Sequence, residues 1–64
     1  MKTTISFKYK DGFWFFSCEV EFGGTCHFWT EVVSESYARE KASSLGMTLP
    51  EHIDGRYVRS VFNL

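Results

Sequence analysis

Two turn signals, Asp11-Gly12 and Gly23-Gly24, constrain the fold of this chain more than any other feature of its sequence. Asp-Gly and Gly-Gly between apolar runs are strong signals for a β-hairpin, because these residues accept the positive φ angles of tight turns. Before the first turn, residues 5–10 alternate between apolar and polar, which is the period of a strand with one wet face. The first half of the chain is therefore predicted to form three strands joined by two hairpins.

The Asp11-Gly12 turn also predicts which residues face one another in the first hairpin. A two-residue turn places Tyr9 across from Trp14, and the pairing then continues along both strands. One face of this hairpin is predicted to carry Ile5, Phe7, Tyr9, Trp14, Phe16 and Cys18. The opposite face is predicted to carry Ser6, Lys8, Lys10, Phe13, Phe15 and Ser17.

The second hairpin can close in two registers, and the one-residue slip between them turns the third strand over. A two-residue Gly-Gly loop turns inward His27, Trp29 and Glu31. A three-residue loop that includes Thr25 turns inward Cys26, Phe28, Thr30 and Val32. We favour the three-residue loop, because it pairs Val20 with Phe28 and leaves the charged residues of these strands in water.

A helix is predicted after the third strand. Ser34 or Ser36 can cap it, Glu35 suits the positive end of its dipole, and Gly46 can end it. Its apolar stripe consists of Ala38, Ala42 and Leu45, with Tyr37 beside them.

After the Asp54-Gly55 turn signal, residues 56–64 alternate again and predict a fourth strand. Its two sides are Val58, Ser60, Phe62 and Leu64 on one, and Tyr57, Arg59 and Val61 on the other. We expect this strand to run parallel to the first and third strands, and both edges of the sheet remain open to it. Beside the first strand, Arg59 would extend the positive strip of Lys8 and Lys10; beside the third, it would meet Glu31.

The predicted fold class is α+β, with the element order β-β-β-α-β. An antiparallel three-stranded meander and a fourth strand form the sheet, and one helix packs on one face of it. Residues 1–64 are taken as a single small domain, since a chain of this length has material for one core. Twelve aromatic residues, seven Phe, three Tyr and two Trp, supply the large side chains for that core.

Composition excludes several function classes. Seven Lys and Arg stand against eight Asp and Glu, so the net charge of −1 gives no bulk attraction to nucleic acid or to an anionic membrane. No apolar run approaches the roughly 18 residues of a membrane helix. The chain starts without the apolar stretch of a secretory signal, and two Cys are too few for a disulfide scaffold, which indicates a cytoplasmic protein.

The sequence carries no pattern typical of catalysis or metal binding. The soft ligands are Cys18, Cys26, His27 and His52, and their spacing matches no metal site. A disulfide between Cys18 and Cys26 fits the favoured register poorly, because they lie two cross-strand pairs apart. No nucleophile has a base near it in the predicted sheet, so we expect no enzyme, no cofactor and no metal.

An aromatic surface is the unusual feature that remains. The favoured register turns outward Phe13, Phe15, Trp29 and Val33, beside Lys8 and Lys10. Exposed rings with a charged rim are typical of interaction surfaces. The alternatives are that the C-terminal segment covers these rings, or that a second copy of the chain does so in a homodimer.

In its layout, Phe13-Trp14 in the second strand and Val58 and Val61 in the last, the chain resembles the small bacteriophage-encoded inhibitors of host RNA polymerase. That resemblance implies a compact α+β protein that acts by binding. The family holds its target through Arg on the final strand. Arg59 stands near such a position but in a different phase of the strand, and Ser60 and Phe62 occupy the places where Arg would be wanted, so the target is not carried over.

The run from Lys10 to Ala42 also resembles, in its strand-strand-strand-helix order, the arm-type DNA-binding domains of phage integrases. We expect a non-enzymatic module that binds a larger host protein in the manner of a phage-type modulator, with no membrane partner. A small DNA-binding domain and a self-associating domain are the alternatives. The expected binding residues are Lys8, Lys10, Phe13, Phe15, Trp29, Val33 and Arg59.

Overall fold

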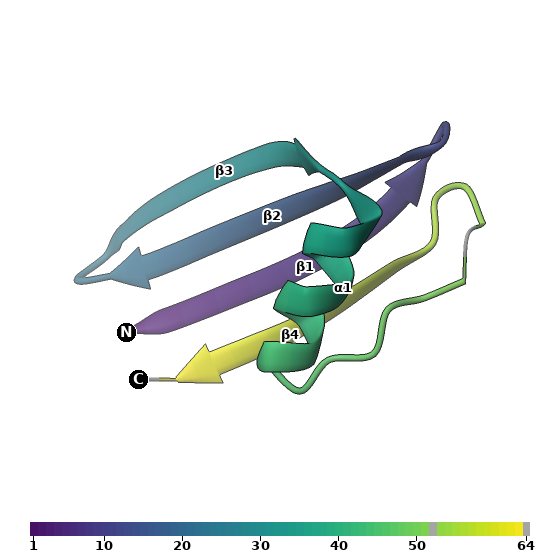
Figure 1. The fold of residues 1–64 in the computed structure, drawn as a ribbon. Helices are drawn as coiled ribbons and strands as arrows, with labels where there is room; N and C mark the ends of the chain where they lie inside the picture. The colour runs from purple at the N-terminus through teal and green to yellow at the C-terminus, as the bar shows by residue number, and fades with distance from the viewer. Residues whose placement is uncertain (52, 64) are drawn as a thin grey trace.

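The computed structural model describes residues 1–51 and 53–63 of the chain. Its elements are β1 (Lys2–Lys10), β2 (Phe13–Phe22), β3 (Thr25–Val33), α1 (Glu35–Ser44) and β4 (Tyr57–Asn63). The strands form one antiparallel sheet in the order β3-β2-β1-β4, and α1 lies across one face of it (Figure 1). This is the predicted α+β fold. We call the covered side of the sheet the helix face and the other side the open face.

The first hairpin has the predicted register. Tyr9 faces Trp14, Phe7 faces Phe16, and every other pair along β1 and β2 follows from these two. Asp11 and Gly12 both have positive φ angles, of 53° and 83°, as a type I′ turn requires. The turn chemistry of two residues therefore sets the faces of the two central strands.

The prediction for the second hairpin is wrong. Gly23 and Gly24 form a two-residue loop, both with positive φ, and Phe22 faces Thr25. A three-residue loop would place its third residue, Thr25, in the left-handed region, which a β-branched residue adopts only at a cost. The loop therefore consists of the two glycines alone, and each residue of β3 lies on the opposite face of the sheet from the one predicted.

The predicted direction of β4 is also wrong, because β4 runs antiparallel to β1. A parallel β4 would have to begin where α1 ends. Instead, the connection that follows α1 runs back along the sheet, and its Met47 and Leu49 pack against the core. Its Asp54-Gly55 turn then joins the end of β1, where the Gly55 amide donates to the Tyr9 carbonyl at 2.9 Å. Asp54 also accepts a hydrogen bond from the Asp11 amide, at 2.9 Å. The chain thus enters β4 at the end where β1 finishes.

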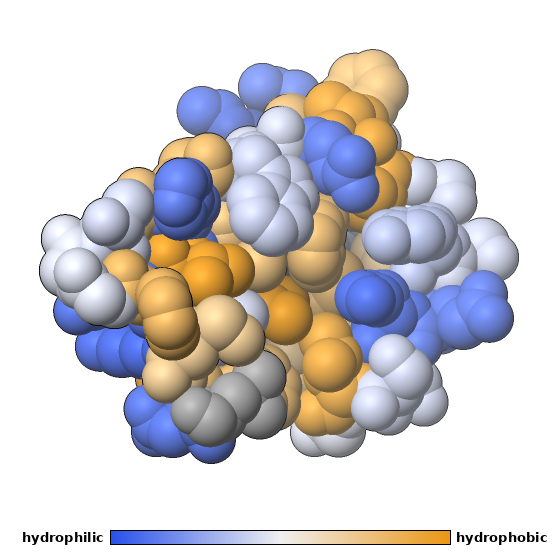
Figure 2. Space-filling view, turned by 90° about the vertical axis from the view of Figure 1, so that its left-hand side faces the viewer, coloured by the Kyte–Doolittle hydropathy of each residue, from blue (hydrophilic) through white to orange (hydrophobic). Residues whose placement is uncertain are grey.

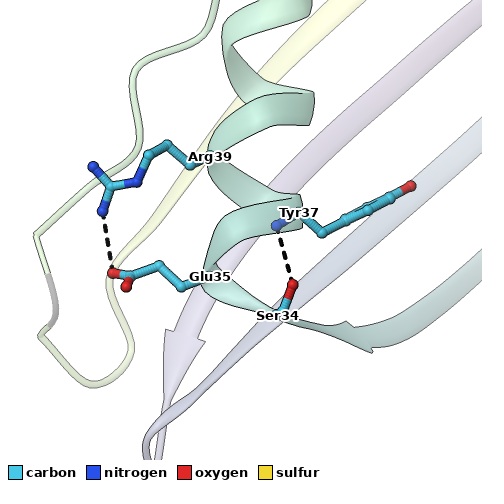
Figure 3. Close-up of polar contacts among 4 residues, drawn as sticks. All are labelled: Ser34, Glu35, Tyr37 and Arg39. Carbon is cyan, nitrogen blue, oxygen red and sulfur yellow. Dashed lines mark hydrogen bonds and ion pairs between the residues drawn. The ribbon is translucent and has the colours of Figure 1, made fainter.

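Helix α1 begins as predicted. The Ser34 hydroxyl accepts a hydrogen bond from the Tyr37 amide at 3.1 Å, and Glu35 forms an ion pair with Arg39 at 3.3 Å (Figure 3). The cap satisfies one of the free amides at the helix start. This orientation turns the predicted small side chains, Ala38 and Ala42, down onto the sheet, where both are buried.

The core lies between α1 and the two central strands. Its buried residues are Ile5, Phe7, Trp14, Phe16, Cys18, Ala38 and Ala42. The Phe7 ring is fully buried and packs at 5.3 Å, centroid to centroid, from the Phe16 ring. Val58 and Phe62, which belong to one predicted side of β4, pack at the side of this cluster, whereas Leu64 of that side lies outside the described residues. Almost all the burial is therefore on the helix face.

Candidate functional site: the open sheet face

Among the described residues, no element packs over the open face of the sheet. Figure 1 shows α1 and the connection after it on the same side, with nothing on the other. The strand pairing arranges the side chains of the open face in rows that cross the sheet from β3 through β2 and β1 to β4. One row consists of Val32, Phe15, Lys8 and Tyr57, and the next row consists of Thr30, Ser17, Ser6 and Arg59. The following row is Phe28, Glu19, Thr4 and Val61. Beyond the first row lie Phe13 and Lys10.

Large apolar side chains are exposed on this face. Phe13 is 57% exposed, Phe28 67% and Tyr57 58%, although each lies in a regular strand. Single exposed apolar residues are ordinary, but several on one face form an apolar patch of the kind that marks an interaction site. Apolar surface is also present at one end of the molecule: Figure 2 shows it gathered between groups of hydrophilic side chains where β1 begins and the β2–β3 hairpin lies.

A shallow hollow of about 430 Å³ lies on the open face. It follows the row of small side chains, because Ser6, Ser17 and Thr30 leave space beside the larger residues of the next row. Phe15, Lys8 and Tyr57 border it, together with Lys10. The Ser17 and Thr30 hydroxyls are joined by a hydrogen bond of 2.9 Å, in which either can be the donor. The hollow thus combines hydroxyl groups, two aromatic rings and two ammonium groups.

The observed register changes the charge of the open face. Glu31 and His27 lie on the helix face, opposite Phe16 and Val20, and not in the water beyond the open face as expected. Lys8 and Lys10 line the hollow, and Arg59 ends the row of small side chains that the hollow follows, whereas Glu19 and Glu21 lie toward the other end of β2. The end of the open face that holds the hollow is therefore cationic.

The structure brings together five of the seven predicted binding residues. Phe13, Phe15, Lys8, Lys10 and Arg59 all lie on the open face, and β4 joins the β1 edge, so that Arg59 extends the positive strip.

Trp29 and Val33 do not lie on this face. They face Cys18 and Trp14 on the helix side, where Val33 packs against the core and Trp29 remains 47% exposed. Their misplacement follows directly from the two-residue Gly23-Gly24 loop, since one residue of slip exchanges the faces of a strand.

Sequence reasoning missed several residues of the open face. The favoured register turns Phe28 and Val32 inward, and Ser6, Ser17 and Thr30 are not among the predicted binding residues. A signal for the hollow was present, because small polar residues at paired positions on a face of larger ones leave a depression. The first-hairpin register already placed Ser6 opposite Ser17.

The two cysteines have different surroundings. Cys18 is in the core, as predicted, and its burial raises the pKa of its thiol. Cys26 is not a core thiol: it is exposed, and it donates a hydrogen bond to a Glu19 carboxylate oxygen at 3.0 Å. That bond is the main reason that the pKa of Cys26 is raised, with the nearby Glu19 and Glu21 charges adding to it. Both thiols are free, and both favour the protonated form, which is the less nucleophilic one.

The described residues include no group of three or more His, Cys, Asp or Glu that could hold a metal ion, and His52 lies outside them. In the same part of the chain, α1 is too short and too polar to cross a membrane.

Comparison of the chain with protein-family models, with curated proteins and with solved structures finds no match.

Proposed function

We propose that this protein is a non-enzymatic binding module that docks its open face on a larger cytoplasmic protein. One observation carries the proposal: a complete face of the sheet is left uncovered by the described residues while it displays Phe13, Phe28 and Tyr57 largely in solvent. Removing apolar area from water contributes about 25 cal/mol per Å², so burial of these rings against a partner would stabilise the complex.

The composition of the face supports a protein as the occupant. Its aromatic residues lie beside charged side chains, Phe13 opposite Lys10, Phe15 opposite Lys8 and Phe28 opposite Glu19, and interfaces are rich in aromatic residues with charged residues at the rim. The strands beneath are fixed by continuous pairing, so little side-chain and backbone freedom remains to be lost on binding.

The identity of the partner is a further step. The resemblance to small phage-encoded inhibitors implies a host protein whose activity the module changes. Arg59 supports this step because it lies on the open face beside the hollow, where it can reach a carboxylate of the target. We propose a phage-type modulator on this basis.

Matched phenylalanine variants test the proposal. Phe13→Ala removes an exposed ring from the open face, and Phe22→Ala removes a ring of similar exposure from the helix face. Tagged wild-type protein and both variants are used to capture partners from bacterial lysate, with and without nuclease, after circular dichroism has shown that each is folded. We expect a nuclease-resistant protein that Phe22→Ala retains and Phe13→Ala loses. Equal capture by both variants would show that the open face is not the docking surface.

A second function, binding of single-stranded nucleic acid, has one observation in its favour. The register that removes Glu31 from the open face leaves Lys8, Lys10 and Arg59 around a hollow bordered by Phe15 and Tyr57. Rings on a sheet serve as stacking platforms, and cations beside them follow the phosphates. Nuclease-sensitive capture, weakened by salt and by the pair Lys8→Glu and Lys10→Glu, would favour this function over the first.

A further inference from the structure

The outer edge of β3 is an unprotected strand edge. In the strand order β3-β2-β1-β4, β3 has a neighbour among the described residues only on its β2 side. It runs for nine residues without a proline, and all of them are exposed except Val33, which is half-buried. Helix α1 turns away from this edge and lies over strands further into the sheet (Figure 1). Long apolar edges of this kind pair with another strand unless charges or prolines prevent it.

The backbone groups of alternate residues point out from this edge. Phe22 and Thr25 flank a two-residue loop and so form a pair with mutual hydrogen bonds, after which bonded and non-bonded pairs alternate. The amides and carbonyls of Cys26, Phe28, Thr30 and Val32 are therefore directed away from β2. A second strand can bond to these groups.

The β3 sequence is complementary to itself. When β3 pairs in antiparallel fashion with β3 of a second copy, full overlap centres the pairing on Trp29, the middle residue of the strand. This register joins the outward-pointing groups of Phe28 to those of the second copy's Thr30. It also places each His27 opposite the Glu31 of the other copy, on the same face as the Trp29 pair. Registers centred on Phe28 or Thr30 lose both the His27–Glu31 pairs and the Trp29 pair.

The other free edge lacks this property. Self-pairing of β4 about its middle residue, Ser60, would place Arg59 opposite Val61 and would form no polar pair of this kind. Polar and charged pairs at an interface mainly select partner and register, and a two-fold interface repeats each of them.

We propose that two copies of this chain associate through their β3 edges, centred on Trp29, to form a dimer with a continuous eight-stranded sheet. The dimer would set the two open faces side by side on one surface. It goes beyond the proposed function, because it uses the strand edge and the helix face and leaves the open face free.

Substitution at the two paired positions tests the dimer. His27→Glu sets a carboxylate against the partner's Glu31, and Glu31→Lys sets an ammonium group against the partner's His27; both residues are exposed, so the fold should tolerate either change. By sedimentation equilibrium from micromolar to millimolar concentration, we expect wild-type protein to dimerise and each variant to do so on the order of tenfold more weakly.

Rescue distinguishes this register from a general loss of association. The double variant, His27→Glu with Glu31→Lys, should regain dimerisation. The two single variants, when mixed, should form a heterodimer that is tighter than the homodimer of either one. A wild-type protein that stays monomeric, variants that dimerise as tightly as wild type, or filaments in place of dimers would each overturn the proposal.

A backbone variant separates strand pairing from charge. Thr30→Pro removes an amide that points outward and leaves the ladder to β2 intact, and Thr30→Ala is its control, since both lose the hydrogen bond to Ser17. The dimer should be lost in Thr30→Pro and retained in Thr30→Ala. Equal association of the two folded variants would contradict pairing through this edge.

Discussion

Replacing Glu21 with Cys tests the β2–β3 register to a single residue. Glu21 faces Cys26 directly, in the pair next to the one that flanks the turn. That pair is of the non-bonded kind, in which facing Cα atoms are about 4.5 Å apart, within the range that a disulfide spans. We expect the introduced thiol to form a disulfide with Cys26 under mild oxidation.

The size of the effect follows from the short loop that the bridge closes. The chain-entropy relation for a loop from residue 21 to residue 26 gives a stabilisation of about 2 kcal/mol over the reduced form. Urea unfolding measures it, and with a slope of about 1 kcal/mol per M for a small protein, oxidation should raise the midpoint by about 2 M. Peptide mapping identifies the bridge.

Phe22→Cys is the matched control. In the observed register Phe22 faces Thr25 and lies on the opposite face of the sheet from Cys26. A thiol introduced at position 22 should therefore stay free. In the register of a three-residue loop, Phe22 would face Cys26 instead. A disulfide in the Phe22→Cys variant and none in Glu21→Cys would refute the register and the faces derived from it.

Three further outcomes are expected. Phe7→Ala should cost about 3–5 kcal/mol of the free energy of unfolding, because Phe7 is fully buried, whereas Phe22→Ala, at an exposed ring, should stay within about 0.5 kcal/mol; equal losses in urea unfolding would misplace the core. Ser34→Ala should cost about 1 kcal/mol by loss of the cap of α1, and unchanged thermal unfolding would contradict that role. Glu19→Gln should lower the pKa of Cys26 and so speed its reaction with a thiol reagent near pH 8, since the thiolate forms at lower pH once the carboxylate is gone; an unchanged pH–rate profile would show that the contact does not persist in solution.

The first hairpin could be predicted completely because two independent signals agree there. Asp11-Gly12 requires one loop length, and the apolar residues of β1 and β2 fall on one face when that loop is used. The same agreement places Lys8, Lys10, Phe13 and Phe15 on one surface from the order of residues alone.

The second hairpin was mispredicted because the two signals conflict. Turning Phe28 and Val32 inward improves the hydrophobic pattern, but it requires Thr25 in a left-handed conformation. Turning these residues inward would bury little apolar area, because α1 packs over the central strands and the helix side of β3 is itself exposed. At an edge strand beyond the helix, the turn outweighs the pattern, and Trp29 was misplaced for this reason.

The direction of β4 depends on contacts that residues outside the strand make. Met47 and Leu49 hold the connection against the core, and Asp54 then bonds to the first turn. These contacts are tertiary, so no local pattern in residues 56–64 reveals them. The faces of β4 were still predicted, because alternation does not depend on strand direction.

The pairing of β4 with β1 has a consequence for when the open face becomes competent to bind. The meander joins residues that are close in sequence, whereas Lys2 pairs with Asn63, near the opposite end of the chain. Closing such a long loop carries an entropic cost before any contact repays it, so β4 should be the last strand to dock in folding and the first to detach. Tyr57 of β4 borders the hollow, which is therefore complete only after that step. A partner that uses this hollow would select chains that have finished folding from those that have not.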